Sequence, residues 1–554
     1  MPVWSQHRLF VQSADSSLVS KNISLPDTVA SMQAGWQKIQ EVIKDWQQQG
    51  YLEAEISAYS HTDSVSKYVL NRGKQYRWAS LRATALSTQQ LNLAGFRRQD
   101  FEGKPFQYKK IATILEKLVE AQENNGYPFA KARLDSIQFE QEQVKATLLL
   151  DTGPEITFDS LQIADSVGVR YPYLSSYLGI QYGEPYTQKK VDKIEQRLKQ
   201  LPYIKLLAPP RLSFENNRAR IYIVAGKQRA NQFEGILALQ NNPAGGVLLT
   251  GQVDLLLQNP FGSGKKLALN WQRLNTSSQQ LNLTYRHPYI LRSRVSAEGN
   301  FSLYRQQDSF LNRNINLALI IQQASGIEFS ILARQLDSRL LDNATGPELA
   351  SFKINLLGVG LALDRTDNII FPTRGASVAF NFLAGPKTIR SLPEGTTQTE
   401  DITNQKFRYL YADAQASYYL RLASRTVLAN SAAAGWLNSP YLFLPDLFRI
   451  GGLYSLRGFR EQSVFTNTYG LVKTEMRRSL GRASYIFLFY DQAVTDQNWQ
   501  GFSNRASWPL GIGAGLNLAS EGGVFSLVYA IGKSGGEQLS TQNSQIHFGY
   551  INRF

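Results

Sequence analysis

Cysteine is absent from this 554-residue chain, and histidine and methionine are scarce, with four and three residues. Without cysteine there can be no disulfide framework, thiol nucleophile or thiolate metal ligand. The histidines are scattered, at His7, His61, His287 and His547, so we expect no metal site. We also find no run of 18 or more apolar residues, and the sequence therefore predicts no transmembrane helix.

Catalytic signatures are missing as well. We find neither a Gly-x-Ser-x-Gly elbow nor a His-Glu-x-x-His pair. The segment 262–266, Gly-Ser-Gly-Lys-Lys, is only superficially similar to a phosphate-binding loop, because the first glycine of that motif would fall at Asn259 and its Ser/Thr at Lys266. We interpret the segment as a hairpin turn. The sequence thus predicts no enzyme activity and no cofactor.

Positive charge is in excess, with 59 basic against 44 acidic residues and a net charge of +15. Such a balance makes nucleic acid a candidate partner. However, the basic residues form no block and are interleaved with apolar ones, so we expect no nucleic-acid binding. Aromatic residues make up 11% of the chain, mostly Tyr and Phe. This composition suits a sheet protein with interfacial aromatic girdles.

The first 226 residues contain a repeated pattern. Gly50-Tyr51 recurs as Gly126-Tyr127 and again as Pro202-Tyr203, at a constant interval of 76 residues. An apolar stripe precedes each pair at spacings of three, four and seven, which predicts one buried helix face per repeat. The stripes are Trp36, Ile39, Ile43 and Trp46; Ile111, Ile114, Leu115, Leu118 and Val119; and Val191, Ile194, Leu198 and Leu201.

Each repeat reads as strand, helix, helix, strand, strand. We therefore predict three α+β domains, at residues 1–75, 76–154 and 155–226. The exposed edge of a small sheet can accept an extended peptide as an additional strand, so these domains are candidate docking sites. The alternative is that they act only as spacers.

From residue 227 the hydrophobic period becomes two. Leu281, Leu283 and Tyr285, for example, alternate with Asn282, Thr284 and Arg286. One apolar and one polar face suit either a soluble sandwich or a membrane barrel. The segment 227–554 is far longer than one sandwich of about 100 residues. We therefore predict a closed transmembrane barrel of 16 antiparallel strands, in which the polar segment 385–405 forms a long outer loop.

The last third carries motifs of a known family. Residues 451–459, GGLYSLRGF, resemble the inner-loop motif Val-Arg-Gly-Phe/Tyr of the bacterial outer-membrane assembly-factor superfamily, the BamA/TamA type, with Leu456 in place of Val. Residues 489–493, FYDQA, resemble its barrel-strand motif Phe-x-Asp-x-Gly, with Ala493 in place of Gly. The three repeats resemble POTRA domains, and their number is more typical of the TamA-like branch.

The resemblance implies a site inside the barrel. The loop 451–459 would fold into the lumen, and Arg457 would pair with acidic residues on adjacent strands, for which Asp491 and Glu475 are the matching positions. Arginine suits this role because its planar fork binds a carboxylate through two hydrogen bonds. The alternative is an exposed arginine in an outer loop. The inner-loop residues in question are Gly452, Leu456, Arg457, Gly458 and Phe459.

The C-terminus resembles the terminal strand signal of outer-membrane barrels, because apolar residues alternate up to a final aromatic residue. This strand would close the barrel against the first one, near residues 232–237, and in the family that seam is a lateral gate. Gly549 lies within the closing strand, where it would weaken packing or simply mark a bend. The predicted seam residues are Phe233, Gly235, Phe548, Gly549, Tyr550 and Phe554.

By resemblance, the chain is expected in the bacterial outer membrane with its N-terminal domains in the periplasm. It would insert or export β-rich client proteins through the seam, surrounded by outer-membrane lipid and lipopolysaccharide, with a periplasmic subunit as a further candidate partner. Two alternatives stay open. A two-partner secretion transporter shares the barrel and the motif but usually has two POTRA domains, and a passive porin-like channel would need no lateral opening.

Overall fold

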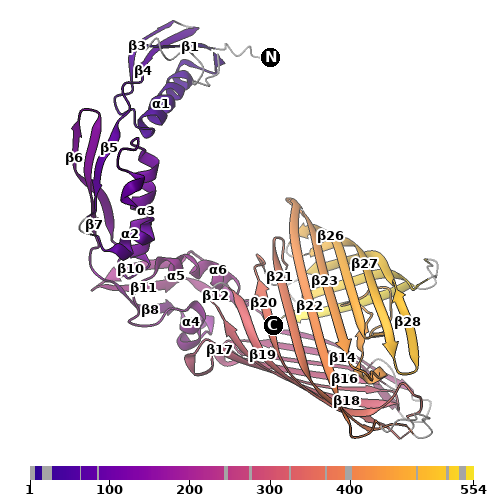
Figure 1. Cartoon of the computed structure of the whole chain (residues 1–554). Coiled ribbons are helices and arrows are strands. Elements are labelled where there is room, and N and C mark those ends of the chain that lie inside the picture. Colours follow the sequence, from indigo (N-terminus) through magenta and orange to yellow (C-terminus); the bar gives the residue numbers. More distant parts are fainter. Residues whose placement is uncertain are drawn as a thin grey trace. The chain divides into compact units, whose positions relative to one another are not determined.

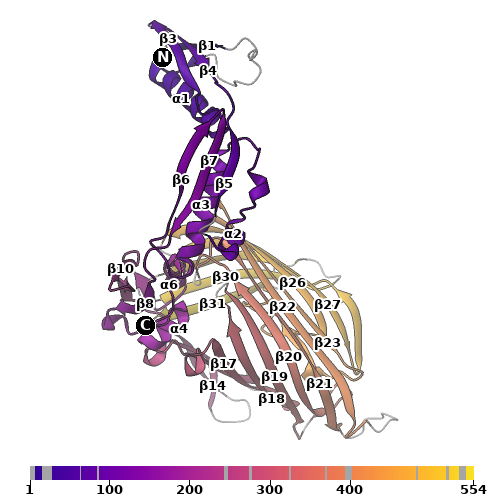
Figure 2. The same ribbon diagram turned by 60° about the vertical axis from the view of Figure 1, so that its left-hand side comes forward.

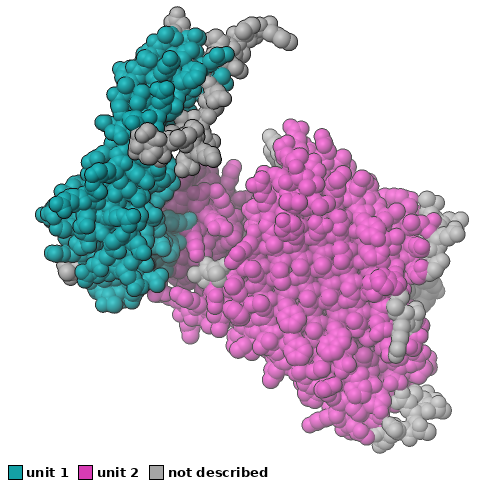
Figure 3. Space-filling model, turned by 45° about the horizontal axis from the view of Figure 1, so that its top comes forward, with its two compact units in different colours: residues 1–160, 182–192, 212–220 teal, residues 161–181, 193–211, 221–554 magenta. Residues whose placement is uncertain are grey.

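The computed structural model of the chain forms two compact units, which Figure 3 distinguishes by colour. One comprises residues 1–160, 182–192 and 212–220, and the other comprises residues 161–181, 193–211 and 221–554. The residues described are 7–14, 28–62, 64–83, 86–241, 247–273, 278–323, 326–342, 344–368, 371–393, 402–481, 484–519, 523–535, 539 and 544–553. Of these, 7, 165, 236–241, 247–250, 504–506, 523 and 548–553 are described by their backbone alone.

The first N-terminal sheet has the strand order β2-β1-β4-β3 and packs against one long helix, α1 (Figure 1). Ser31 caps this helix, because its hydroxyl oxygen accepts a hydrogen bond from the amide of Ala34 at 3.2 Å. The elements are β1 (His7–Ser13), β2 (Thr28–Val29), α1 (Met32–Gln48), β3 (Glu55–Thr62) and β4 (Val65–Asn71).

The second sheet has the order β5-β7-β6, with two helices packed against it (Figure 2). This second repeat has the strand, helix, helix, strand, strand order that the pattern predicts. The described part of the first repeat differs, because two strands precede its one helix, α1. The elements are β5 (Arg77–Arg82), α2 (Thr88–Ala94), the 3-10 turn η1 (Arg98–Asp100), α3 (Tyr108–Glu123), β6 (Lys131–Glu140) and β7 (Gln143–Asp151).

The third sheet has the order β10-β11-β8, and a two-stranded sheet, β12-β9, leads towards the barrel. The predicted third domain, 155–226, is thus divided between the two compact units. The elements are β8 (Thr157–Ile163), the 3-10 turn η2 (Asp165–Val167), α4 (Tyr171–Leu178), α5 (Gln188–Asp192), α6 (Ile194–Lys199), β9 (Ile204–Leu206), β10 (Arg211–Glu215), β11 (Arg218–Ile223) and β12 (Ala225–Lys227).

The apolar stripes agree with the helices in most positions. Ile39, Ile43 and Trp46 are buried on α1. Trp36, which was expected on the same face, is 40% exposed, because it lies at the border of that face and packs its ring against Tyr59 at 5.9 Å. The third stripe is divided between α5 and α6 rather than lying on one helix. None of the helices in the described ranges combines the length and the apolarity needed to cross a membrane.

Residues 232–553 form a closed antiparallel barrel, coloured magenta to yellow in Figure 1. Closure pairs the backbone groups of neighbouring strands, as a lipid environment requires. The strands are β13 (Gln232–Asn241), β14 (Val247–Gln258), β15 (Lys266–Arg273), β16 (Ser278–His287), β17 (Val295–Gln306), β18 (Phe310–Gln322), β19 (Ile327–Leu340), β20 (Ser351–Asp364), β21 (Gly375–Ser391), β22 (Lys406–Ala423), β23 (Thr426–Asn438), β26 (Thr468–Gly481), β27 (Ser484–Trp499), β28 (Phe502–Ser507), β29 (Leu510–Ala519), β30 (Gly523–Lys533) and β31 (Ser544–Arg553).

Two of these segments, β28 and β29, are parts of one strand. Both pair with β27, and the register is continuous across the break between them, from Thr495 opposite Ser507 to Gln492 opposite Leu510. Within the pairing of β27 with β28, the register shifts by one residue between Thr495 and Gln497. Pro509 lies at the break, where its carbonyl accepts from the amide of Ala493 at 2.9 Å but its own nitrogen cannot donate. The described residues therefore contain sixteen barrel strands, as the sequence predicts.

Side chains alternate between the outer face and the lumen. On β26, for example, Met476 and Leu480 are outward and about half exposed, whereas Glu475 and Arg477 face the lumen. We call the end of the barrel at which β13 begins the entry end. The turn at residues 259–265 lies at this end, where it joins β14 to β15, and it forms the hairpin predicted for it.

The strands β20 to β22 are long, and they extend over a segment that the sequence pattern assigned to a loop. Residues 385–391 of the expected outer loop continue β21 and pair with β20 and β22. The prediction of a loop here is wrong. It assumed that polar residues are exposed, whereas Lys387 is fully buried beside Phe352 and Phe443. Most of the remainder of that loop, residues 394–401, lies outside the described residues.

Candidate functional site

The loop between β23 and β26 occupies the barrel lumen and forms the centre of the candidate site. β24 (Phe448–Ile450) pairs with β25 (Val464–Thr466), so residues 451–463 form the tip of a hairpin. The backbone φ angles of Gly451 and Gly452 are 122° and 99°, a region that residues with a side chain rarely adopt. The path of the tip therefore requires glycine at both positions.

The tip lies directly on the wall formed by β29 and β30. A Cβ atom on Gly458 would lie 2.6 Å from the amide nitrogen of Gly532, and one on Gly511 would lie 2.0 Å from the carbonyl oxygen of Arg457. Neither distance leaves room for a side chain. Glycines on the loop and on the wall thus allow main chain to pack against main chain.

Arg457 extends from this tip to two acidic side chains. Its Nε and Nη2 donate to the two carboxylate oxygens of Asp491 on β27, at 2.7 and 2.6 Å. Its Nη1 donates to Oε1 of Glu475 on β26 at 2.5 Å, and its guanidinium lies 3.7 Å from the centre of the Phe489 ring. The two positions matched to the family motif are therefore the ones that hold this arginine.

The network is buried. Arg457 is 3% exposed and Asp491 is fully buried, while Glu475 also accepts from Nε of Arg477 at 2.7 Å. Two guanidinium groups thus face two carboxylates. Removing one member would leave an unpaired buried charge, which is strongly destabilising.

The apolar motif residues support the same loop. Leu456 is fully buried with Ile450, Leu471 and Ala493, and Phe459 packs against this cluster. Position 493 is alanine where the family motif has glycine. The methyl group of Ala493 is fully buried within the cluster, so the site accommodates it.

The seam between the first and last strands has few pairs. β13 and β31 are paired at two positions, Gln232 with Arg553 and Phe233 with Asn552. By contrast, β13 is paired with β14 at ten positions and β31 with β30 at nine. Within the described residues, the barrel is therefore least connected at the junction predicted as a gate.

The predicted seam residues occupy different places. Phe233 is 45% exposed and takes part in the seam pairing, and Gly235 follows it on β13 beyond the paired part. Gly549 is paired with Ser526 on β30 instead. Phe554 lies outside the described residues, and the side chains of Phe548 and Tyr550 are not described either.

A belt of polar side chains lines the lumen on β14 to β19, and the sequence analysis did not identify it. Its members donate from one strand to the next at 2.5 to 3.2 Å. The tip of the loop reaches the same wall, where Gln462 donates to Gln280 at 2.6 Å. The belt consists of Asp254, Asn270, Asn282, Thr284, Asn300, Asn316 and Arg334.

A tyrosine cluster at the entry end was missed as well. The hydroxyls of Tyr173 on α4 and Tyr203 lie 2.5 Å apart, and the Tyr173 ring packs 5.9 Å from that of Tyr289 in a barrel turn. Burial raises the pKa of Tyr173 well above its usual value. The amide of Arg170 also donates to the carbonyl of Gly262 at 2.8 Å, so α4 is fixed to two turns of the barrel.

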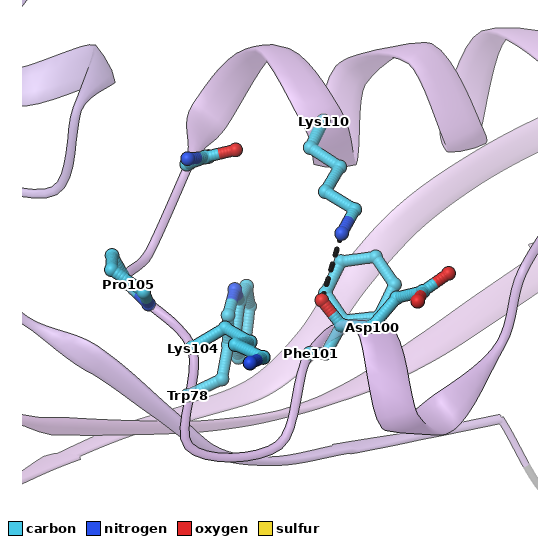
Figure 4. A pocket seen from close by; sticks show the side chains of 7 residues that line it. Trp78, Asp100, Phe101, Lys104, Pro105 and Lys110 are labelled. Atoms are coloured by element: carbon cyan, nitrogen blue, oxygen red, sulfur yellow. Dashed lines mark hydrogen bonds between the residues drawn. The ribbon is translucent and has the colours of Figure 1, made fainter.

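A small pocket of about 210 Å³ lies in the second domain at the start of α3 (Figure 4). Lys110 borders it and donates from Nζ to the carbonyl of Asp100 at 2.8 Å. Trp78 and Phe101 belong to the buried core behind it, at 2% and 1% exposure. Little aromatic surface is therefore available to a ligand, and we assign none.

The comparison with known families decides the identity of the barrel. Residues 259–554, more than half of the chain, match the Omp85 superfamily domain. The chain belongs to the Omp85 superfamily. This Omp85 protein is a β-barrel protein of the bacterial outer membrane, and its N-terminal domains, which resemble POTRA domains, lie in the periplasm.

Individual relatives are distant. The outer membrane protein assembly factor BamA of Neisseria meningitidis serogroup B is 20% identical over an alignment 481 positions long, which covers 78% of this chain and 57% of that relative. This Omp85 chain thus spans little more than half the length of the curated relative. The fold is shared with CdiB from Escherichia coli, at 14% identity and a TM-score of 0.57, covering 94% of this chain and 98% of CdiB. CdiB from Acinetobacter baumannii also shares the fold, at 14% sequence identity and a TM-score of 0.54, covering 87% of this chain and 90% of that CdiB.

Proposed function

We propose that this Omp85 protein inserts β-rich client proteins into the outer membrane by opening the seam between β13 and β31. The observation that carries this proposal is the unequal pairing, two positions at the seam against ten and nine at the adjoining junctions. Opening the seam frees few backbone groups, and each group left unpaired in lipid costs several kcal/mol. A free edge in lipid then favours pairing with a client strand, because unpaired backbone groups are costly there.

The loop tip has a positioning role in this proposal. Arg457 ties it to β26 and β27, and Gly458 rests on β30, the neighbour of the closing strand. The wall from β26 to β30 is thereby held from within the lumen. The first strands of the barrel can then move away from a fixed wall when the seam opens.

The N-terminal domains are proposed to receive clients before insertion. We retain residues 1–75, 76–154 and 155–226 as three proposed POTRA-like domains preceding the barrel at 227–554. The edge strand β6 exposes Ile137 and Phe139, at 48% and 58%, and leaves one side unpaired within the described sheet. An extended peptide can add to such an edge. A periplasmic subunit and the surrounding lipid and lipopolysaccharide complete the proposed partners.

The name of the N. meningitidis relative supports the same function, because it is an assembly factor for outer-membrane proteins. The free energy would come from the client, whose strands pair and bury apolar surface in lipid as they insert. We propose no nucleotide, cofactor or catalytic step. The assignment to the TamA-like branch stays a prediction.

A disulfide lock tests the seam. Phe233→Cys and Asn552→Cys place two thiols at paired positions, and Cα atoms across a sheet lie within the range of a disulfide. The native chain has no cysteine, so no further thiol competes with this pair. In proteoliposomes, the oxidised variant should no longer fold a urea-denatured outer-membrane barrel, measured by its heat-modifiable gel mobility, and reduction should restore the activity.

The matched control locks a junction that need not open. Asn300→Cys and Asn316→Cys lie opposite each other on β17 and β18, and their oxidation should leave activity unchanged. Full activity of the oxidised seam variant would contradict lateral opening. It would favour the second candidate, passage of a secreted chain through the lumen, for which the polar belt on β14 to β19 provides hydrogen-bonding side chains.

A further inference from the structure

An apolar groove of about 570 Å³ lies on the outer face of the barrel, across β26, β27, β29 and β30. This volume falls within the range of about 300–1,000 Å³ typical of small-molecule sites. The groove is separate from the lumen loop and from the seam. Because the outer face of an Omp85 barrel is in contact with lipid, the possible occupants are those that the membrane supplies.

The strand registers explain how the groove forms. Met476, Leu488, Ala514 and Tyr529 lie opposite one another and form one transverse row of outward side chains. Three of these side chains are large, and each is between 42% and 60% exposed. Ala514 is the small member, so the wall is hollow between Leu488 and Tyr529.

The next row, nearer the entry end, contains a charge. Arg478 lies opposite Ile486, and that row continues through Leu516 to Leu527. Arg478 is exposed on the outer face and borders the groove, and no carboxylate within the described residues forms an ion pair with it. A cation in an otherwise apolar, lipid-facing row is costly unless it reaches a polar partner.

The position of Arg478 identifies that partner. It precedes Gly481, the last residue of β26, by three positions, or about 10 Å along a strand. This end of the barrel is the periplasmic end, so a long arginine side chain can extend to the headgroups of the periplasmic leaflet. The guanidinium fork is suited to the oxygens of a phosphate.

We propose that this groove is a specific phospholipid-binding site of the periplasmic leaflet. The phosphate of the headgroup binds Arg478, and one acyl chain lies over Ala514 between the side chains of Leu488 and Tyr529. The lipid comes from the periplasmic leaflet because the cation and the groove lie on that side of the wall. A bound phospholipid would thus fill a defect in the outer surface of the strands that carry the lumen network.

Native mass spectrometry of the full-length protein tests this site. The detergent-solubilised barrel is mixed with dioleoyl phosphatidylglycerol, and the fraction carrying one lipid is measured as detergent is removed by activation. We expect one retained lipid per chain. Arg478→Gln removes the charge and Ala514→Phe fills the groove, and each change should abolish the retained adduct.

The controls separate this site from ordinary surrounding lipid. Ala416 is an outward-facing, exposed alanine on β22, opposite Val378 and Ala432, so Ala416→Phe makes the same change outside the groove and should retain the adduct. Heat-modifiable gel mobility verifies that every variant is a closed barrel. Equal adducts in all four proteins would indicate surrounding lipid only and would overturn the proposal. Retention of lipopolysaccharide but not of phosphatidylglycerol would overturn it as well.

Discussion

At the scale of single residues, Arg457 is held by several contacts in the lumen. It is 3% exposed, contacts two carboxylates and has its own carbonyl against Gly511. Its charge is therefore compensated by fixed partners rather than by water. Such a network depends on all its members, because each remaining charge keeps its desolvation cost when its partner is lost.

Arg457→Ala should lower the free energy of unfolding of the barrel by about 3–5 kcal/mol, because Asp491 and Glu475 would remain buried without this partner. The measurement is urea-induced unfolding in detergent. Arg305→Ala is the matched control, since Arg305 pairs with the exposed Asp308 and should contribute about 1 kcal/mol or less. Equal losses in the two variants would contradict the structural role of the lumen network.

Arg457 and Asp491 were accessible from the sequence because short motifs mark them, and Glu475 was accessible through the family resemblance. Arg477, which also pairs with Glu475, was not identified because no motif marks it. The seam residues were accessible only in part, since pairing between the first and last strands is a long-range property. The lumen belt and the tyrosine cluster could not be inferred, because single polar or aromatic residues on alternating strands carry no local signal of their neighbours. Tyr173 and Tyr177 lie close together in the sequence, but their partner Tyr289 follows more than 100 residues later.

At the scale of elements, hydrophobic period separates helices from strands but does not show where strands end. The period of two predicted the barrel strands, whereas the polar segment after Gly385 was interpreted as a loop. β21 continues to Ser391 because Lys387 forms a buried ion pair with Asp446. Polarity indicates exposure only when no partner for the charge lies within reach, and sequence alone does not reveal such a partner.

The Lys387–Asp446 pair joins β21 to the segment that precedes the lumen hairpin, and both side chains are fully buried. Lys387→Met alone should destabilise the barrel by about 3–5 kcal/mol, because Asp446 would be left unpaired. The double variant Lys387→Met, Asp446→Leu should recover most of this loss, since apolar replacements remove both desolvation costs. Urea unfolding of the single and double variants measures the coupling.

An exposed pair provides the comparison. Lys38 and Glu41 are 50% and 66% exposed on α1. For Lys38→Met and Glu41→Leu, the coupling free energy between the two replacements should be below about 1 kcal/mol. If the buried double variant were no more stable than its single variants, the pair would contribute more than its desolvation costs. The junction of β21 and the hairpin would then depend on the charges themselves.

At the scale of the whole molecule, the described part of the barrel has sixteen strands, and the seam is its least paired junction. Closure distributes its stability over many long ladders, whereas the seam depends on two paired positions. The number of strands could be predicted from chain length and period. The weakness of the seam could not, because it depends on how far the two terminal strands overlap.

Oxidation of Phe233→Cys with Asn552→Cys should raise the temperature at which the compact, unboiled band of the barrel is lost, because thermal opening should begin at the least paired junction. Oxidation of Asn300→Cys with Asn316→Cys should raise it less, since β17 and β18 are already paired at twelve positions. Gel mobility after incubation at increasing temperature measures both. A larger rise for the second pair would place the weakest junction elsewhere.

The connection between the third domain and the barrel has a mechanical consequence. β12 ends at Lys227, where it pairs with Ile204 of β9, and the seam pairing begins at Gln232. The linker between them, residues 228–231, is only four residues long. A pulling force on this linker therefore acts directly on the first pair of the seam, Gln232 with Arg553. Force of this kind would load the Gln232–Arg553 pair before the Phe233–Asn552 pair, so mechanical opening would begin at the entry end of the seam.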